Sequence, residues 1–436
     1  MRIKISIIII IAIMTGFLSG CYDRREVDDL AYAVAIGLDK GKTNILRLTL
    51  QLAVPLVIAG GGGGNKGSTG GGGGGGAEGE QKTDTIVVET PSLLAGVNMI
   101  NNFLSKQVNL SHAQVIVISE ELAREGQLDR YLHAIVRSRE IRPNMYVAVS
   151  RGTAESYIRS IKPILDANPS KYYNEIFSTN YTGFITNTQF FTFYNNTEAL
   201  DIQPVATLVS ENRFKSDNDF DRTGSTYAEK GRNQPFEGDY KAGDIPKSGD
   251  VKGEAMGMAV FKGDRMVGEL DGENSTYWLM VIGRYNYSFF TFPDPKVGDR
   301  FVVINLKQSR NPIRKVDLSG GKPVISLTVI LEGDIASIQS SENYESDTKT
   351  LETAVAEFLK NGVLRFLNQT KEFGSDICGF GREAKMKFLT WKEWIGYKWL
   401  DRYRDATFNV NVDFKIRRPG LIIRSIPATE TSGGME

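Results

Sequence analysis

The chain has 436 residues, of which 41% are hydrophobic, and it carries 52 basic and 52 acidic side chains. This balance gives no support for a nucleic-acid partner or for an overall electrostatic grip on anionic lipid. Two histidines, His112 and His133, are too few for a His-rich metal site and make a histidine-based catalytic triad hard to build. We therefore expect neither a metal ion nor a cofactor, and the length predicts two or three globular domains.

Residues 1–20 are typical of a bacterial lipoprotein signal peptide. A positively charged start precedes an apolar stretch at residues 5–17, which is shorter than the roughly 20 residues of a membrane-spanning helix. Small residues then lead into a cysteine, so we predict cleavage between Gly20 and Cys21 and attachment of lipid to the Cys21 sulfur. Lipid chains would hold the mature chain at the outer face of a membrane. The alternative is an ordinary secretory signal that ends at a cysteine by chance.

A short charged segment follows the predicted lipid site, and it is either a solvated linker or a docking contact with a membrane partner. If Cys21 carries lipid, Cys378 is the one remaining cysteine of the sequence, so no intramolecular disulfide can form. We expect Cys378 to be a small core residue. The charged segment consists of Asp23, Arg24, Arg25 and Glu26.

The first predicted domain, residues 21–205, alternates strands and helices after an initial hairpin. Such alternation favours α/β layering with a sheet that is at least partly parallel. Ser92 and Ser119 are placed to cap two of the helices, and Val136 is expected on the inward face of the second. We expect strands at residues 30–38, 45–54, 85–89, 113–119 and 144–150, and helices at 92–106, from 119 onward and at 153–162.

Residues 60–79 are dominated by glycine and have almost no side chains to bury. The segment contains G-x-G-x-x-G many times over, but no strand leads into it and no amphipathic helix follows, so it indicates no nucleotide site. We predict a disordered loop inserted between two strands of one domain. A hinge between two domains is the alternative, although only about forty residues would precede it.

The remainder divides into a small middle domain, residues 206–292, and a larger domain, residues 293–427. Residues 163–205 are irregular and aromatic, which predicts a packed connector or, less simply, a functional groove. Residues 211–252 are polar and are expected to form a mobile loop, and residues 428–436 a disordered tail. Further strands are expected at 257–261, 266–270, 301–307, 324–332 and 406–416, a short helix at 277–282 and a long helix at 345–373.

No pattern in the sequence supports an active site, so we expect a protein without enzymatic activity. There is no G-x-S-x-G, no H-E-x-x-H and no C-x-x-C, and no paired carboxylates recur at a useful spacing. Asp217, Asp219 and Asp221 alternate, but Arg222 and Ala228 stand where an EF-hand needs glycine and glutamate.

Several segments, in order, resemble the Ger(x)C family, the lipoprotein C subunits of spore germinant receptors. The similarity begins at Gly20 and Cys21, with Tyr22 where that family usually has tryptophan, and runs to about residue 424. The glycine tract and the long polar loop depart from the family pattern. The motif positions are Gly37, Asp39, His112, Glu120, Gly126, Arg142, Phe261, Gly268, Asp376, Gly379, Phe380 and Gly381.

The resemblance implies an α+β or mixed α/β fold of three domains, each with a mixed β-sheet flanked by helices. It also implies a non-catalytic protein at the outer leaflet of the inner spore membrane. The implied partners are two multi-spanning receptor subunits, one of them permease-like, that together respond to nutrients. The alternative is an extracytoplasmic solute-binding lipoprotein of a transporter, a class that usually shows two similar lobes around a cleft.

Overall fold

The computed structural model describes residues 5, 29–53, 83–162, 169–178, 182–212, 214, 225–340 and 342–418. The predictions for Cys21, for the charged segment at 23–26, for the glycine tract at 60–79 and for the tail at 428–436 concern residues outside these ranges. Among the described residues, no helix combines the length and apolar character needed to cross a bilayer.

A large mixed sheet occupies the first part of the chain. Its centre is parallel, because β1 pairs with β5, β5 with β6 and β6 with β7 in parallel, while the hairpins at both edges are antiparallel. The order is β3-β2-β1-β5-β6-β7-β8-β9, and β4 also pairs with β1. The strands are β1 (Leu30–Lys40), β2 (Leu46–Ala53), β3 (Thr83–Thr90), β4 (Gln107–Asn109), β5 (Val115–Ser119), β6 (Tyr146–Ser150), β7 (Val205–Glu211), β8 (Gly253–Lys262) and β9 (Arg265–Leu270).

Helices cover both faces of this sheet, as the parallel crossovers require. One face packs against α3, α4, α5 and α8, and the opposite face packs against α6 and α7. The predicted caps form, since Ser92 accepts a hydrogen bond from the Ala95 N–H and Ser119 accepts one from the Leu122 N–H. The helices are α3 (Leu93–Ile100), α4 (Glu120–Glu125), α5 (Asp129–Arg137), α6 (Ala154–Ser160), α7 (Pro169–Ser178) and α8 (Phe190–Glu198).

The single helix expected from residue 119 onward is wrong. Gly126 and Gln127 have φ of +82° and +64°, which ends α4 and starts α5 in a new direction. Val136 is consequently 50% exposed rather than inward. The aromatic connector also contains two helices, α7 and α8, whose Tyr173 and Phe193 are buried.

The second sheet has the order β10-β11-β12-β13, with a parallel last pair. Helix α10 makes the crossover between β12 and β13, and its apolar stripe from Leu351 to Leu367 is buried as the periodicity predicts. The elements are α9 (Gly272–Ile282), β10 (Tyr287–Pro293), β11 (Phe301–Asp317), β12 (Val324–Ile338), α10 (Thr348–Phe373), α11 (Gly381–Lys385), α12 (Trp391–Tyr397), α13 (Trp399–Tyr403) and β13 (Thr407–Arg418), with a short 3₁₀ turn η3 (Ala228–Lys230).

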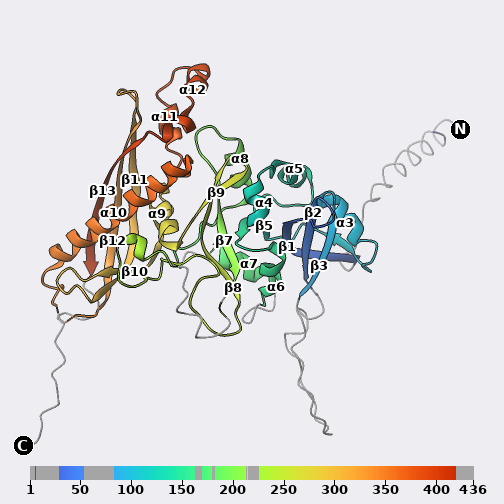
Figure 1. Ribbon diagram of the computed structural model, residues 1–436, viewed down its shortest axis with the longest axis horizontal. Coiled ribbons are helices and arrows are strands. Elements are labelled where there is room, and N and C mark those ends of the chain that lie inside the picture. Colours follow the sequence, from blue (N-terminus) through green and yellow to red (C-terminus); the bar gives the residue numbers. More distant parts are fainter. Residues whose placement is uncertain are drawn as a thin grey trace, which may run out of the picture.

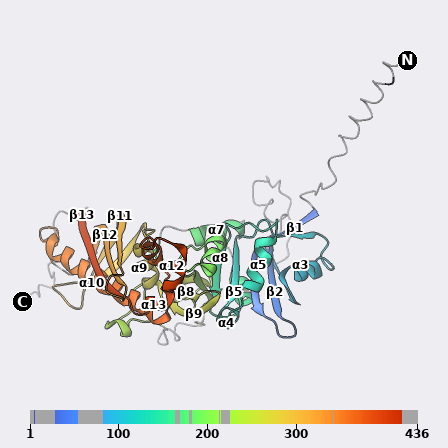
Figure 2. The ribbon, with the colours of Figure 1, turned by 90° about the horizontal axis from the view of Figure 1, so that it is seen from above.

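The expected mixed α and β content is confirmed, but the described residues form two sheets where the sequence led us to expect three. Strands β7, β8 and β9 extend the first sheet. Val205, Met258 and Val260 on these strands belong to the same apolar core as the second sheet and α10. Figures 1 and 2 show the two sheets following one another along the long axis of the molecule, with α9 between them.

Candidate functional site

The linker between α10 and α11, residues 374–380, packs against the first sheet and joins the two halves of the molecule. Ser375 Oγ donates a hydrogen bond to the Phe261 carbonyl at 2.5 Å. The Trp278 Nε1–H donates to the Ile377 carbonyl at 2.9 Å. These bonds connect one segment to β8 and to α9, so we call this region the junction.

Asp376 is the central polar residue of the junction. Its side chain is fully buried, and its carboxylate accepts hydrogen bonds from the Gly381 N–H at 2.8 Å and from the Trp399 Nε1–H at 2.9 Å. The Phe380 N–H donates to the same carboxylate at 3.1 Å. Burial raises the pKa of Asp376 to about 6, although these hydrogen bonds favour the charged form. The main-chain carbonyl of Asp376 also accepts from the Gln203 N–H at 2.9 Å.

Glycines allow the close approach of the two halves. A Cβ built on Gly268 would meet the Phe373 ring, and one built on Gly381 would lie 2.5 Å from the Asp201 carbonyl oxygen. Gly379 has φ of +70° and faces Ile202. The motif positions that meet at the junction, though far apart in sequence, are Phe261, Gly268, Asp376, Gly379, Phe380 and Gly381.

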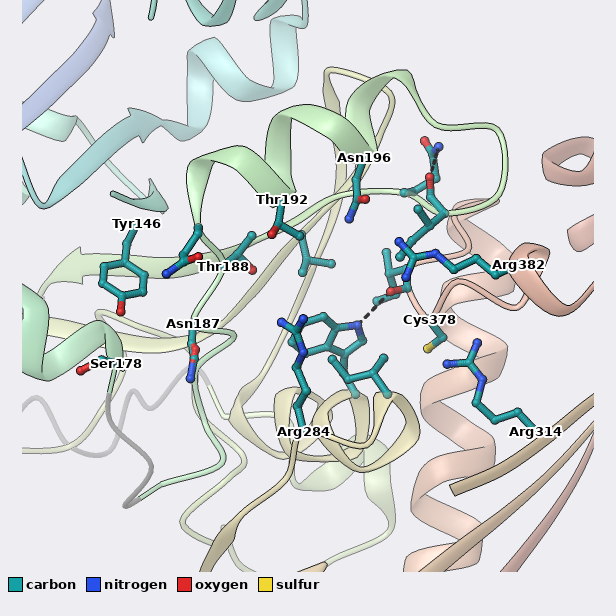
Figure 3. A pocket seen from close by; sticks show the side chains of 17 residues that line it. Tyr146, Ser178, Asn187, Thr188, Thr192, Asn196, Arg284, Arg314, Cys378 and Arg382 are labelled. Atoms are coloured by element: carbon teal, nitrogen blue, oxygen red, sulfur yellow. Dashed lines mark hydrogen bonds between the residues drawn. The ribbon is translucent and has the colours of Figure 1, made fainter. Parts of the chain in front are cut away.

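A pocket of about 540 Å³ borders the junction (Figure 3). Amide and hydroxyl side chains from α8 and the segment before it line one side. Trp278 of α9 also lines the pocket. The Arg284 side chain reaches the pocket from the end of α9, and Arg382 reaches it from α11. Asn187, in the left-handed conformation with φ of +44°, has a buried Oδ1 with no hydrogen-bond partner among the described residues.

The pocket is lined mainly by neutral polar side chains and arginines. Among the described residues that line it there is no carboxylate and no histidine. Burial raises the pKa of the Cys378 thiol well above its ordinary value, so this sulfur stays protonated and is a poor nucleophile. Arg314 Nε lies 3.0 Å from Glu383 Oε1, and its guanidinium lies over the Phe380 ring. The amide and hydroxyl side chains, together with Arg284 and Arg382, offer hydrogen-bond donors and acceptors that suit a small polar molecule.

Two other motif positions stabilise the first sheet away from the junction. The Asp39 carboxylate accepts hydrogen bonds from the Ala154 N–H at 2.6 Å and from the Glu155 N–H at 3.0 Å, which caps α6. Burial raises the pKa of Asp39, and the two backbone bonds oppose that shift. A Cβ on Gly37 would lie 2.8 Å from Ile158 Cδ1, so glycine lets α6 approach β1.

The remaining motif positions lie at separate places. The His112 ring packs edge-on against Tyr32 with ring centroids 4.5 Å apart. Glu120 and Arg124 form an ion pair at 2.6 Å within α4. Gly126 lies beside Arg265, and Arg142 is exposed.

A buried group of charges, which we call the ion cluster, has no counterpart among the residues predicted from the sequence. Lys230 Nζ lies 2.5 Å from Asp239 Oδ1, 2.5 Å from Glu273 Oε2 and 2.9 Å from Asp271 Oδ2. Arg232 Nη1 lies 2.8 Å from Asp239 Oδ1. The side chains are at most 9% exposed, so the described part of the polar loop is fastened to the start of α9 rather than mobile. No local signal marks this arrangement, because its partners are distant in sequence.

Comparison with known proteins matches two family models to this chain. Residues 23–211 match the spore germination protein N-terminal domain, and residues 256–420 match the family described as spore germination B3/GerAC like, C-terminal.

Curated relatives and one solved structure resemble the chain over nearly its full length. Spore germination protein KC of Bacillus subtilis (strain 168) is 25% identical over 93% of both chains. The putative spore germination protein YfkR of that organism is 24% identical over 94% of this chain and 95% of its own. The crystal structure of the GerBC protein superposes with a TM-score of 0.48 and 14% identity, covering 88% of this chain and 96% of that one.

Proposed function

Because the chain belongs to the Ger(x)C family of spore germination proteins, we propose that it is the membrane-anchored lipoprotein subunit of a germinant receptor, acting by protein contact rather than catalysis. The observation that carries the proposal is the ordered match of both family models, at residues 23–211 and 256–420. The gathering of motif positions at the junction supports it, because those residues pack the two halves of the molecule against each other.

In this proposal, lipid on Cys21 attaches the protein to the outer leaflet of the inner spore membrane. Residues between Cys21 and the start of β1 at Leu30 can span roughly 30 Å when extended, so the first sheet stays close to the lipid surface. The proposed partners are two multi-spanning receptor subunits, one of them permease-like. The charged residues at 23–26 lie within that reach and are the proposed docking contact.

The anchor is tested with Cys21→Ala in spores. We expect the variant to leave the inner-membrane fraction, because a chain without lipid has no anchor, and nutrient-triggered germination to slow. Cys378→Ala is the matched control, since it removes the buried cysteine and leaves the lipid site intact. Full membrane association together with full germination in Cys21→Ala would overturn the proposal.

A second candidate, solute binding, is favoured by the pocket at the junction. The polar lining, the unpartnered Asn187 Oδ1 and the Arg382 side chain suit a small polar solute. Calorimetry on the full chain in detergent, with amino acids, sugars and nucleosides as probes, tests it. Heat of binding that Arg382→Ala abolishes would favour this candidate, and no heat with any probe would contradict it.

A further inference from the structure

Four large apolar side chains are exposed together at the end of α11 and on α12. Met386 is 76% exposed, Leu389 is 96% exposed and Trp391 is 57% exposed. Ile395, at 48%, follows Trp391 by four residues and shares its face of α12. We call these four side chains the apolar tip. Figure 1 shows α11 and α12 projecting from the body of the molecule.

A helix cap and aromatic packing fix the position of the apolar tip. Thr390 and Glu393 form a reciprocal capping box that fixes the start of α12. Trp394, three residues after Trp391, is only 2% exposed and stacks near Trp399 with ring centroids 6.4 Å apart. The Phe388 ring centroid lies 5.7 Å from that of Trp394. Packing of Phe388 and Trp394 against each other and of Trp394 against Trp399 therefore leaves the apolar tip on the solvent side.

Positive charge surrounds the apolar tip. Residues 382–404 contain seven basic and three acidic side chains, in a chain whose total charges balance. Two of these acids are already engaged, since Glu383 pairs with Arg314 and Glu393 accepts the Thr390 N–H. Lys385 Nζ lies 4.8 Å from the centre of the Trp391 ring and 3.5 Å from Asp201 Oδ2. Exposed lysines at 387 and 392 flank the same surface.

We propose that the apolar tip docks onto a membrane surface with anionic lipid headgroups. Tryptophan prefers the boundary between headgroups and acyl chains, and lysine stems cover apolar surface while their ammonium groups meet lipid phosphates. The surface projects outward and its surrounding charge has one predominant sign, which complements an anionic bilayer. The proposal goes beyond the lipid anchor but rests on it, because a tethered chain makes the second contact at high effective concentration.

The test places an environment-sensitive fluorophore on Leu389→Cys in the full lipidated chain. The probe lipids are vesicles of phosphatidylcholine alone or mixed with phosphatidylglycerol. We expect a blue shift of the label and its quenching by brominated lipid in the anionic vesicles only. The same label on Val136→Cys, which is 50% exposed on α5 in the first half, is the matched control and should not shift. Replacing lysines 385, 387 and 392 by glutamine should remove most of the shift.

Flotation of the same chain with phosphatidylcholine vesicles reports the lipid anchor alone. A chain that floats but shows no shift at position 389 in anionic vesicles overturns the tip proposal and leaves the proposed anchor intact. A shift that appears only after membrane subunits of the receptor are added identifies a protein partner and likewise overturns it. A chain that neither floats nor shifts contradicts both proposals.

Discussion

Asp376 shows how much one residue contributes to the junction. Its two carboxylate oxygens receive three donors, from Phe380, Gly381 and Trp399, inside a region with no solvent access. Asparagine is close in size but offers one acceptor oxygen, and its amide group would face a donor. The residue type is therefore required by hydrogen bonding and not by shape.

We expect Asp376→Asn to reduce the free energy of unfolding by about 1–3 kcal/mol at neutral pH, because a buried donor loses its acceptor. The pKa of Asp376 is raised in the fold to about 6 from 3.8, so the folded state binds this proton more tightly than the unfolded state does. The group's contribution to stability therefore rises as pH falls from about 6 to about 4. Urea unfolding at several pH values should show the wild-type advantage over the variant growing in that range.

The exposed Asp413→Asn is the control for this titration, because its carboxylate lies on the open face of β13. It should leave the unfolding free energy nearly unchanged. A constant difference between wild type and Asp376→Asn from pH 7 to pH 4 would contradict the raised pKa.

Gly381 tests the close approach of the two halves. Gly381→Ala places a methyl group against the Asp201 main chain and the Trp399 indole, neither of which can move freely, so we expect a loss of about 1–3 kcal/mol. Gly396→Ala, in α12 with open space around it, should be neutral or stabilising, since alanine favours helix. Thermal unfolding of both variants measures the contrast. Equal changes in stability for the two variants would show that the two halves can move apart at the junction without loss of stability.

At the scale of elements, the ion cluster fastens a loop that composition alone suggested was mobile. Two cations and three carboxylates lie within ion-pair distance with side chains almost fully buried. Carboxylates buried in this way stay charged only because the cations accompany them, and the cations hold the pKa of Glu273 below its usual value despite its burial. The loop, η3 and the start of α9 therefore form one unit.

Lys230→Met should lower the free energy of unfolding by about 3–5 kcal/mol, because Arg232 is then left to neutralise three buried carboxylates. The measurement is urea unfolding, and limited proteolysis should show new cleavage between residues 225 and 252. Lys360→Met, on the exposed side of α10, is the matched control and should change stability little. Resistance of Lys230→Met to both treatments would mean that the ion cluster does not hold the loop.

The predicted glycine-rich loop, residues 60–79, lies in the sequence between β2 and β3. Its flanking strands, β2 and β3, are antiparallel neighbours that pair from Leu46 and Thr90 to Ala53 and Thr83. This pairing agrees with an insertion between two strands of one sheet. The hinge alternative has no support, because both ends of the tract lead into the same sheet.

Replacing residues 60–79 by a short turn should change the unfolding free energy by less than about 1 kcal/mol, because the cost of closing a flexible loop varies slowly with its length. Thermal unfolding measures the effect. Deleting residues 226–233 is the contrasting control and should destabilise the protein, because it removes both cations of the ion cluster. A large loss from shortening the tract would contradict its role as a passive insertion.

At the scale of the whole molecule, the apolar core of the second sheet includes residues from the first sheet. Met258 and Val260 of β8 contribute to the core that α10 and the second sheet complete, while Ala259 and Phe261 of the same strand face the first core. Alternate side chains of one strand thus serve both halves. This arrangement explains why the motif positions of the second half lie against the first sheet.

Sequence alone determined the elements whose signals are local. The stripe from Leu351 to Leu367 predicted α10, the serine caps predicted α3 and α4, and the alternation of strands and helices predicted a partly parallel sheet. The order of the family-like segments along the chain also predicted the relationship to spore germination proteins. These inferences succeed because periodicity, capping and motif order are properties of neighbouring residues.

Tertiary structure alone decided which distant residues meet. It joined β7, β8 and β9 to the first sheet, gathered Lys230 with Glu273, and placed Asp376 against Trp399. It also left the four apolar side chains of the apolar tip exposed. The physical reason is that pairing of strands, burial of charge and exposure of apolar side chains depend on contacts across the whole fold, which no local pattern records.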